Sequence, residues 1–390
     1  MSKPQTVFIV AGEASGDLHA ANLCRELLGM DDSIQLQGMG GKNMRDVGVD
    51  VLFDASKLAV VGIVEVLFKY RMIKGVLNQI QDHITQSPPD LLILVDYQEF
   101  NQKLAAYAKA IGIKVLFYIG PQVWAWRPKR VYKMARIVDQ MAVIFPFEVD
   151  LYKEANVPVE FTGHPLVDEI IPDKTIQQAR TALSLEEKTT VGLFPGSRMG
   201  EIERLLPIML ASAKLLREKK PELQFVLPLA STVQREDLIE YGKSLVELNV
   251  HLVENNTHDV IQACDSIIVA SGTATLEIGL MGTPMVITHK LAWLSYFILS
   301  RLVKISHIGL VNIVPQKEIV KEFIQHDATP ENLATETLKI LDDGTYNKNM
   351  RDELSKLREL LGTGGGSKNV ARLAYSMVKN KNSESNEIRS

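Results

Sequence analysis

Apolar segments of strand length alternate with helix-length segments along nearly the whole chain, and this alternation constrains the fold more than any other feature. The apolar segments show no regular polar interruption, a pattern typical of strands buried on both faces of a parallel sheet. Successive parallel strands need helical connections, which the intervening segments provide. We therefore predict a doubly wound α/β protein. The predicted strands are TVFIVA (6–11), SIQLQGM (33–39), LLILVD (91–96), KVLFYI (114–119), QMAVIF (140–145), TTVGLFPG (189–196), LQFVLPLA (223–230), NVHLVE (249–254), SIIVAS (266–271) and TPMVITHK (283–290).

The strand pattern restarts near residues 161–170, which predicts two domains. A length of 390 residues gives each domain enough chain for its own core. We expect a first Rossmann-like domain at 1–166, rejoined by terminal helices within 347–380, and a second at 167–346. The polar segment 381–390 is expected to be disordered. Two such domains would bind ligands at the carboxyl ends of their strands, in the crevice between them.

Composition excludes several classes of protein. Hydrophobic residues make up 46% and charged residues 23% of the chain, a globular composition. The net charge of −4 gives no reason to expect a nucleic-acid partner. Cys24 and Cys264 lie far apart in sequence and are expected to be buried, reduced thiols. The N-terminus does not have the pattern of a signal peptide and no apolar run is long enough to span a bilayer, so the cytoplasm is the expected location.

Four turns that directly follow predicted strands are candidates for binding or catalysis. They are AGEASGD (11–17), VDYQEFN (95–101), FPGSR (194–198) and ASGTATLE (270–277). The first leads into a predicted helix capped by Ser15 or Asp17. For each turn taken alone, the alternative is a tight connection whose glycines only relieve backbone strain.

Known nucleotide-binding motifs are missing from the sequence. In QGMGGKN (37–43), Asn43 stands where the third glycine of a dinucleotide-binding motif is needed. The chain has no GxxxxGK[ST] and no Asp-x-Asp, so we expect no metal and no cofactor.

A bound diphosphate would therefore need helix N-termini and an arginine to balance its charge. Arg198 is the candidate arginine, and Glu277 lies one helical turn beyond Thr273, where its carboxylate could accept two ribose hydroxyls. The remaining candidate ligands are backbone N–H groups and hydroxyls of Ser197, Ser271, Gly272 and Thr273.

Motifs along almost the entire chain resemble the lipid-A-disaccharide synthase family, inverting glycosyltransferases with the two-domain GT-B fold. The most specific are AGEASGD and the VWAWR within PQVWAWRPKR (121–130). The others are VVGIVEVL (60–67), IFPFE (144–148), GHPLVDE (163–169), FPGSR, ASGTATLE and PMVITHK (284–290).

The resemblance implies a hexosyltransferase of lipid A (lipopolysaccharide) biosynthesis. It would join UDP-2,3-diacylglucosamine to 2,3-diacylglucosamine 1-phosphate through a β-1,6 linkage and release UDP. Two segments depart from the family pattern. The usual Asp-x-Pro-Asp-Phe-Asn is replaced by DYQEFN (96–101), and VNIV (311–314) keeps Asn312 without the preceding proline.

The reaction needs a general base and stabilisation of the leaving diphosphate. Asp96 is the first candidate for the base and Glu13 the second; the alternatives are a capping carboxylate and a brace for the glycine turn. Asn312 would help position the diphosphate, unless it is an ordinary turn residue. Trp124 and Trp126 would share one face of a strand and line an acyl or sugar surface, or form a buried aromatic pair.

Two apolar stretches, 58–77 and 291–304, are too short to span a membrane. Basic residues interrupt or follow both, which favours peripheral contact with an anionic inner membrane, on its cytoplasmic face. The expected membrane or acyl-chain patch comprises Val61, Ile63, Val66, Leu67, Trp124 and Trp126. Buried core helices are the alternative, and a homodimer is an open alternative to a monomer.

Two other functions remain open. A UDP-sugar 2-epimerase of GT-B fold would share the diphosphate and ribose features without an acceptor site. A non-catalytic, membrane-associated nucleotide-sugar-binding protein would keep the patches without turnover.

Overall fold

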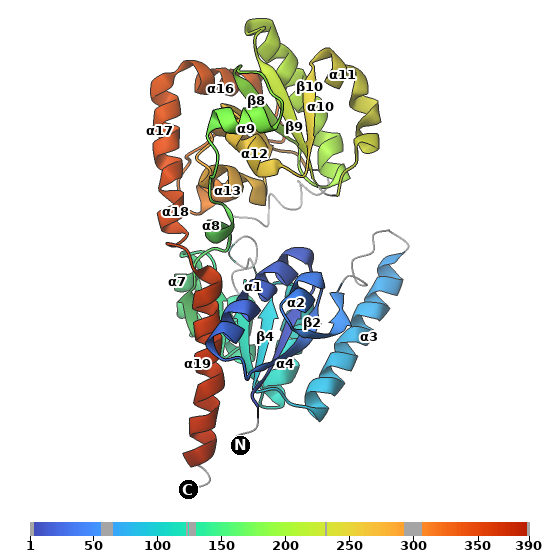
Figure 1. The fold of residues 1–390 in the computed structure, drawn as a ribbon, viewed down its shortest axis with the longest axis vertical. Helices are drawn as coiled ribbons and strands as arrows, with labels where there is room; N and C mark the ends of the chain where they lie inside the picture. Colours follow the sequence, from blue (N-terminus) through green and yellow to red (C-terminus); the bar gives the residue numbers. More distant parts are fainter. Residues whose placement is uncertain are drawn as a thin grey trace. The chain divides into compact units, whose positions relative to one another are not determined.

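The computed structural model describes residues 4–55, 65–121, 124, 130–230, 232–291 and 306–387 (Figure 1). The chain forms two compact units, each described by itself below. Unit 1 consists of Met1–Asp168 and Gly362–Ser390, and unit 2 of Glu169–Leu361.

Unit 1 is built on a seven-stranded sheet with the order β3-β2-β1-β4-β5-β6-β7, in which neighbouring strands are parallel. Its central strands are apolar and buried on both faces, as the sequence predicted. The strands are β1 (Thr6–Ala11), β2 (Gln35–Gly40), β3 (Asp50–Asp54), β4 (Leu91–Val95), β5 (Lys114–Tyr118), β6 (Gln140–Val143) and β7 (Val159–Phe161).

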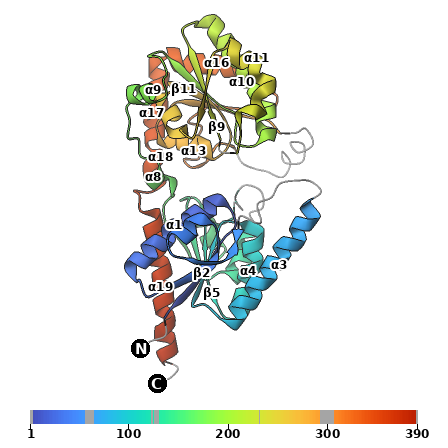
Figure 2. The same cartoon turned by 45° about the vertical axis from the view of Figure 1, so that its right-hand side comes forward.

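Helices cover both faces of this sheet (Figures 1 and 2). On one face, α3 (Glu65–Gln86), α4 (Gln98–Ala110) and α6 (Val131–Ile137) pack on β1, β4 and β5. On the other face, α1 (Ala14–Met30) packs beside α19 (Gly366–Glu387), which brings the C-terminal helix back to the first unit. The shorter helices are α2 (Lys42–Asp46), α7 (Glu148–Glu154) and α8 (Leu166–Glu169).

Unit 2 repeats the design with a six-stranded sheet in the order β10-β9-β8-β11-β12-β13, again with parallel neighbours. The strands are β8 (Thr190–Phe194), β9 (Gln224–Leu229), β10 (Val250–Glu254), β11 (Ser266–Ala270), β12 (Met285–His289) and β13 (Glu322–Ile324).

One face of the unit 2 sheet packs against α10 (Met199–Lys219) and α16 (Pro330–Asp342). The remaining helices are α9 (Ile176–Ala182), the 3₁₀ helix η3 (Arg235–Tyr241), α11 (Gly242–Glu247), α12 (Thr257–Ala263), α13 (Thr273–Leu280), α15 (Leu310–Ile313), α17 (Gly344–Ser355) and α18 (Leu357–Leu360). The predicted fold class is confirmed in both units.

The strand order reverses between β1 and β4 in unit 1, and between β8 and β11 in unit 2. At such a switch point the connections leave in opposite directions and open a crevice at the carboxyl ends of the two strands. The four candidate turns follow β1, β4, β8 and β11. Each unit therefore brings two of them together at its own switch point.

Several boundaries differ from the sequence prediction. Helix α1 begins at Ala14 with Glu13 at its N-cap, so the expected cap by Ser15 or Asp17 is wrong. Unit 2 extends to Leu361 rather than 346, because Leu354 and Leu357 pack near Gly279 of α13. The expected disordered tail from 381 is helical through Glu387, and no proline or glycine interrupts this part of α19.

Candidate functional site

The FPGSR and SGTATLE turns of unit 2 line one pocket with a volume of about 440 Å³. FPGSR connects β8 to α10, and SGTATLE connects β11 to α13. The pocket residues include Ser197, Arg198, Glu201, Gly272, Thr273 and Glu277. Two segments about 75 residues apart in sequence thus form one cavity at the switch point, as parallel-sheet geometry predicts.

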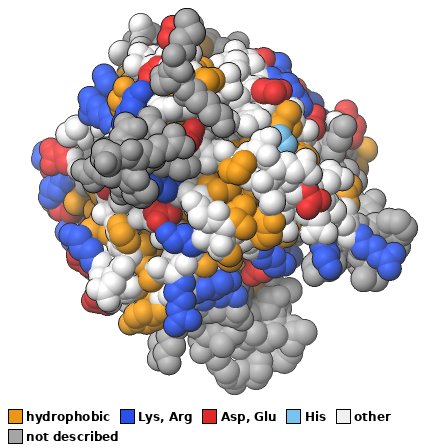
Figure 3. All heavy atoms as spheres, turned by 90° about the horizontal axis from the view of Figure 1, so that it is seen from below, with side chains coloured by type: hydrophobic (Ala, Val, Ile, Leu, Met, Phe, Trp, Pro, Cys, Tyr) orange, Lys and Arg blue, Asp and Glu red, His pale blue; other side chains and the backbone are white. Residues whose placement is uncertain are grey.

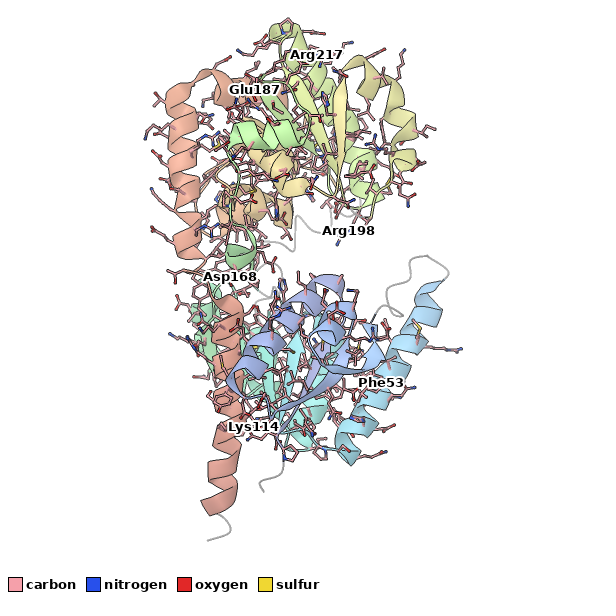
Figure 4. The ribbon with its side chains drawn as sticks, in the orientation of Figure 1. Phe53, Lys114, Asp168, Glu187, Arg198 and Arg217 are labelled. Carbon is pink, nitrogen blue, oxygen red and sulfur yellow. The ribbon has the colours of Figure 1, made fainter. Side chains whose placement is uncertain are left out.

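Arg198 is the N-cap residue of α10, and its side chain is 83% exposed. It projects outward from unit 2 (Figure 4). Its guanidinium group lies 3.4 Å from the Glu201 carboxylate. Gly196 has a φ of +111°, and a Cβ there would lie 2.4 Å from Glu201 Oε2. The glycine therefore permits both the turn and the approach of Glu201, an acidic neighbour that sequence analysis did not single out.

The start of α13 supplies the backbone donors of the pocket. Gly272 and Thr273 are exposed there, and the first N–H groups of a helix have no intrahelical partner. Ser271 differs from the prediction. Its hydroxyl donates to the Ile308 carbonyl oxygen at 2.9 Å and its N–H to that of Thr288 at 3.1 Å. Both Ser271 donors are therefore used inside the protein, which leaves Gly272 and Thr273 to meet a ligand.

Glu277 lies on α13 with its side chain 24% exposed. Burial raises the pKa of Glu277, and His258, whose Nε2 lies 4.0 Å from Oε2, lowers it. His258 and Thr257 follow β10 and line a second cavity of about 580 Å³. Thr257 lines both cavities, so they adjoin. The segment ENNTHD (254–259) had the signal used elsewhere, polar residues directly after a strand, but was missed.

Asn312 does not have the predicted role in this structure. Its side-chain amide donates to the Val320 carbonyl oxygen and to Glu322 Oε1, both at 2.8 Å. Its oxygen accepts the N–H groups of Ile319 and Val320 at 2.7 and 3.0 Å. All four hydrogen-bonding positions of the side chain are occupied. Asn312 is fully buried and fastens its loop rather than offering groups to a diphosphate.

In unit 1, Glu13 follows β1 and Asp96 follows β4, so both carboxylates lie at the switch point. Asp96 is half-buried and Glu13 is exposed. Burial raises the pKa of Asp96, and the nearby Glu13 charge raises it further. A half-buried carboxylate with a raised pKa is a stronger base than an ordinary aspartate.

The turn that carries Asp96 is strained. Asp96 and Tyr97 have φ values of 50° and 46°, in the left-handed region that non-glycine residues rarely occupy. Such conformations cost about 1–3 kcal/mol each and persist where the surroundings hold them. Asn101 contributes to this, because its amide donates to the carbonyl oxygens of Val95 at 3.3 Å and Asp96 at 2.6 Å.

Asp17, the last residue of AGEASGD, holds a neighbouring turn. Its buried carboxylate accepts the N–H groups of Gly41 at 2.6 Å and Asn43 at 2.9 Å. These bonds fasten the loop between β2 and α2. The aspartate in this motif is thus structural, and the exposed Glu13 is the carboxylate that remains for chemistry.

Trp124 has a helical backbone, so the prediction that it lies on a strand is wrong. Its ring meets Phe147 edge-on, with 5.3 Å between centroids, and Phe145 stacks on Phe147 at 5.4 Å. Trp124 is therefore part of an aromatic cluster in unit 1. Trp126, its expected companion, lies outside the described residues.

The predicted membrane patch lies mostly outside the described part of the chain. Val61 and Ile63 are not described, nor are the side chains of Val66 and Leu67 on α3. Further along this helix, Leu77 is buried and packs in the unit 1 core. Leu77, at the end of the stretch 58–77, is therefore a core residue, whereas Arg71, Met72 and Lys74 before it are exposed. The stretch 292–304 is also outside the described residues.

The described residues contain neither a cluster of metal ligands nor a helix suited to span a membrane. No group of three or more histidine, cysteine, aspartate or glutamate side chains in this part of the chain could hold a metal ion. No helix there is long and apolar enough to cross a membrane. On the face shown in Figure 3, the described basic, acidic and hydrophobic side chains lie interspersed.

Comparison by sequence with known proteins finds relatives that belong to one family. The family described as lipid-A-disaccharide synthetase matches residues 7–374. The lipid-A-disaccharide synthase of Geobacter metallireducens is 48% identical over 376 residues, which cover 96% of this chain and 98% of that protein. That of Trichlorobacter lovleyi is 47% identical over 380 residues, covering 97% and 99%.

Among solved structures, UDP-GlcNAc 2-epimerase from Neisseria meningitidis, bound to UDP-GlcNAc, superposes with a TM-score of 0.65. The match covers 95% of this chain and 100% of that one at 14% sequence identity. Similarity at this level of identity shows a shared fold and carries no information on the reaction.

Proposed function

Because the chain belongs to the lipid-A-disaccharide synthase family, we propose that it transfers 2,3-diacylglucosamine from its UDP derivative to 2,3-diacylglucosamine 1-phosphate. The product is a β-1,6-linked disaccharide of lipid A biosynthesis, and UDP is released. The observation that carries the proposal is the position of the four candidate turns. In each unit, two of them meet at the switch point of a parallel sheet.

The donor is assigned to the pocket of unit 2. Its diphosphate would accept hydrogen bonds from the N–H groups of Gly272 and Thr273 and from the Arg198 guanidinium group. Glu277 would accept the hydrogen bonds of the ribose hydroxyls. The adjoining cavity beside His258 offers space for the uracil ring of UDP. Arg198 would exchange its Glu201 partner for the diphosphate, since the 3.4 Å pair is largely exposed and therefore weak.

The general base of the reaction is assigned to unit 1. The Asp96 carboxylate would take the proton of the acceptor 6-hydroxyl as its oxygen attacks the anomeric carbon of the donor. The bond from that carbon to the diphosphate breaks, and UDP leaves with the electron pair. Direct displacement converts the α-linked donor into a β-linked product. Glu13 would keep Asp96 basic through its nearby charge.

A UDP-sugar 2-epimerase is less well supported. The solved epimerase shares 14% identity with this chain, whereas the lipid-A-disaccharide synthase of Geobacter metallireducens shares 48%. The epimerase alternative therefore rests on fold alone.

We also propose peripheral attachment to the cytoplasmic face of an anionic membrane. Both substrates carry acyl chains, and Arg71, Met72 and Lys74 are exposed on α3 beside the apolar segment that precedes them. Basic side chains next to apolar ones favour anionic lipid surfaces. A homodimer is compatible with this proposal and is not required by it.

The function is tested by incubating the protein with UDP-2,3-diacylglucosamine and 2,3-diacylglucosamine 1-phosphate in mixed micelles. We expect equal amounts of UDP and disaccharide. Omitting the acceptor should abolish UDP release. Conversion of the donor to its 2-epimer without UDP release would support the epimerase instead, and UDP-sugar binding without any product would support a binding protein.

A further inference from the structure

Tyr97 is an aromatic residue in a backbone conformation that aromatic residues seldom adopt. Its φ of 46° directly follows the 50° of Asp96, so two left-handed residues stand between β4 and α4. A bulky residue keeps this conformation only where its surroundings hold it there. The contacts of the Tyr97 ring therefore help to hold the turn in this conformation.

The ring lies directly against Gly12, in the turn after β1. A Cβ added to Gly12 would lie 2.3 Å from Cδ1 and Cγ of Tyr97 and 2.7 Å from Cε1. These three ring atoms are the nearest neighbours of that position. Gly12 is not among the glycines with positive φ, so an alanine fits its backbone. A glycine is needed at position 12 because the Tyr97 ring leaves no space for a Cβ, and not because the turn needs a positive φ.

Phe100 provides a second neighbour of the Tyr97 ring. Its ring is 5.3 Å from that of Tyr97, at an angle of 37°. Phe100 is buried on α4, which begins one residue after Tyr97. The Tyr97 ring thus has neighbours in both the β1 turn and the first turn of α4, and Asp96 is attached to Tyr97 through one peptide bond.

We propose that Tyr97 is a positioning residue for Asp96: its ring, seated on Gly12, holds the left-handed turn and keeps water from one side of the carboxylate. The inference rests on the proposed role of Asp96 as the base. It also explains how the chain does without the proline that the resemblance leads one to expect after Tyr97. Here a ring contact with Gly12 supports the turn in place of a restricted backbone at Gln98.

The electrostatic surroundings agree with this role. In the described part of the chain, Glu13 from the β1 turn is the ionisable group whose charge acts on Asp96, and Tyr97 acts on it only through its backbone N–H. Burial and then the Glu13 charge raise the pKa of Asp96, while the Tyr97 N–H lowers it. Removing the ring would admit water and reduce the first effect. The pKa of Asp96 should then fall toward that of an ordinary aspartate.

A double-mutant cycle between positions 12 and 97 tests the proposal. Tyr97→Phe keeps the ring and should keep turnover. Tyr97→Ala should lower kcat about ten- to a hundred-fold with little change in KM. Misplacing the Asp96 base slows the chemical step and leaves substrate binding unchanged. The acidic limb of the Tyr97→Ala kcat–pH profile should move to lower pH. Gly12→Ala should reproduce both effects by displacing the ring.

The double variant provides the sharpest outcome. Once Tyr97 is alanine, the ring atoms that a Gly12→Ala side chain would meet are gone, so this substitution should have little further effect on kcat. Additive losses, or a Tyr97→Ala pH profile identical to that of the unchanged protein, would overturn the proposal. Tyr97→Gly guards against a folding failure, because it removes the ring and relieves the left-handed strain. We expect it to fold normally and still lose turnover.

Asp96→Asn separates this inference from the proposed function. If Asp96→Asn loses turnover while Tyr97→Ala and Tyr97→Gly keep it, the base stands and the positioning role is refuted. If Asp96→Asn keeps turnover, the base assignment itself fails. UDP affinity should be unchanged in every variant, since its proposed ligands are in unit 2, and urea denaturation serves as the control for folding of unit 1.

Discussion

Arg198 and Glu201 lie one helical turn apart at the start of α10 and line the same pocket with opposite charges. A diphosphate entering this pocket would be attracted by one and repelled by the other. Substitutions at these two residues should therefore change UDP affinity in opposite directions. Glu277, on α13, lines the same pocket and provides a third position to test.

Arg198→Ala and Glu277→Ala should each weaken UDP binding by about 1–3 kcal/mol, the usual range for a charge-assisted hydrogen bond. Glu201→Gln should instead strengthen it modestly, because it removes a negative charge and releases Arg198. Isothermal titration calorimetry with UDP measures all three. Weaker binding in Glu201→Gln would mean that this carboxylate supports the turn at Gly196 rather than competing with the ligand.

Glu148 and His164 of unit 1 should make the free energy of unfolding depend on pH in opposite directions. Burial raises the pKa of Glu148 to about 7 from its ordinary 4.5. The stability that its protonated form contributes is complete below about pH 4.5 and is lost as pH rises through 7. Burial, and then His19, lower the pKa of His164 to about 3 from 6.5, so its contribution is present above 6.5 and is lost as pH falls toward 3.

Glu148→Gln cannot ionise but keeps an oxygen to accept the Phe145 N–H. Relative to this variant, the unchanged protein should lose roughly 1–3 kcal/mol of unfolding free energy between about pH 5 and 8. His164→Asn should show the opposite trend, with the unchanged protein losing relative stability between about pH 7 and 4. Urea denaturation at each pH measures both. Parallel curves for Glu148→Gln and the unchanged protein would show that Glu148 is ionised when folded.

At the scale of elements, the central strands could be predicted from sequence, as could the edge strand β10, but the edge strands β3, β7 and β13 could not. β4, β8 and β11 are buried along their whole length, so each appears as a continuous apolar run. β3, β7 and β13 are only partly buried and have mixed sequences. Their place in the sheet depends on pairing with neighbours that a local pattern does not contain.

The same distinction applies to the site. Turns that follow buried strands were found because their position is a local property. Ser271 donates its hydroxyl to Ile308 and Asn312 donates its amide to Glu322, so these groups are already used inside the protein. No local sequence pattern reveals such contacts. The contact of Tyr97 with Gly12 joins segments 85 positions apart in the same way.

Helix α3 offers an element-scale test of membrane attachment. Arg71→Glu with Lys74→Glu should weaken binding to vesicles that contain anionic phosphatidylglycerol, by about 1 kcal/mol or more for each reversed charge. Lys243→Glu with Lys348→Glu, at side chains of unit 2 that are 88% and 74% exposed, is the matched control and should change little. Vesicle flotation measures the bound fraction. Equal losses in both proteins would reflect net charge alone and would count against attachment through α3.

At the scale of the whole molecule, the proposed reaction is divided between two parallel sheets. We propose that unit 2 supplies donor ligands at the β8–β11 switch point and that unit 1 supplies the base at the β1–β4 switch point. A defect in either unit should therefore have its own kinetic signature. Loss of a unit 2 ligand weakens donor binding, whereas loss of the base slows the chemical step with the donor still bound.

The single-turnover rate of Asp96→Asn at saturating donor and acceptor tests this central claim most directly. We predict a fall of about 10²–10⁴-fold, the usual contribution of a general base, with nearly unchanged affinity for UDP and a β-linked product in the unchanged protein. A near-normal rate would contradict the assignment of Asp96 and transfer attention to Glu13. An α-linked product would contradict direct displacement, whichever carboxylate acts.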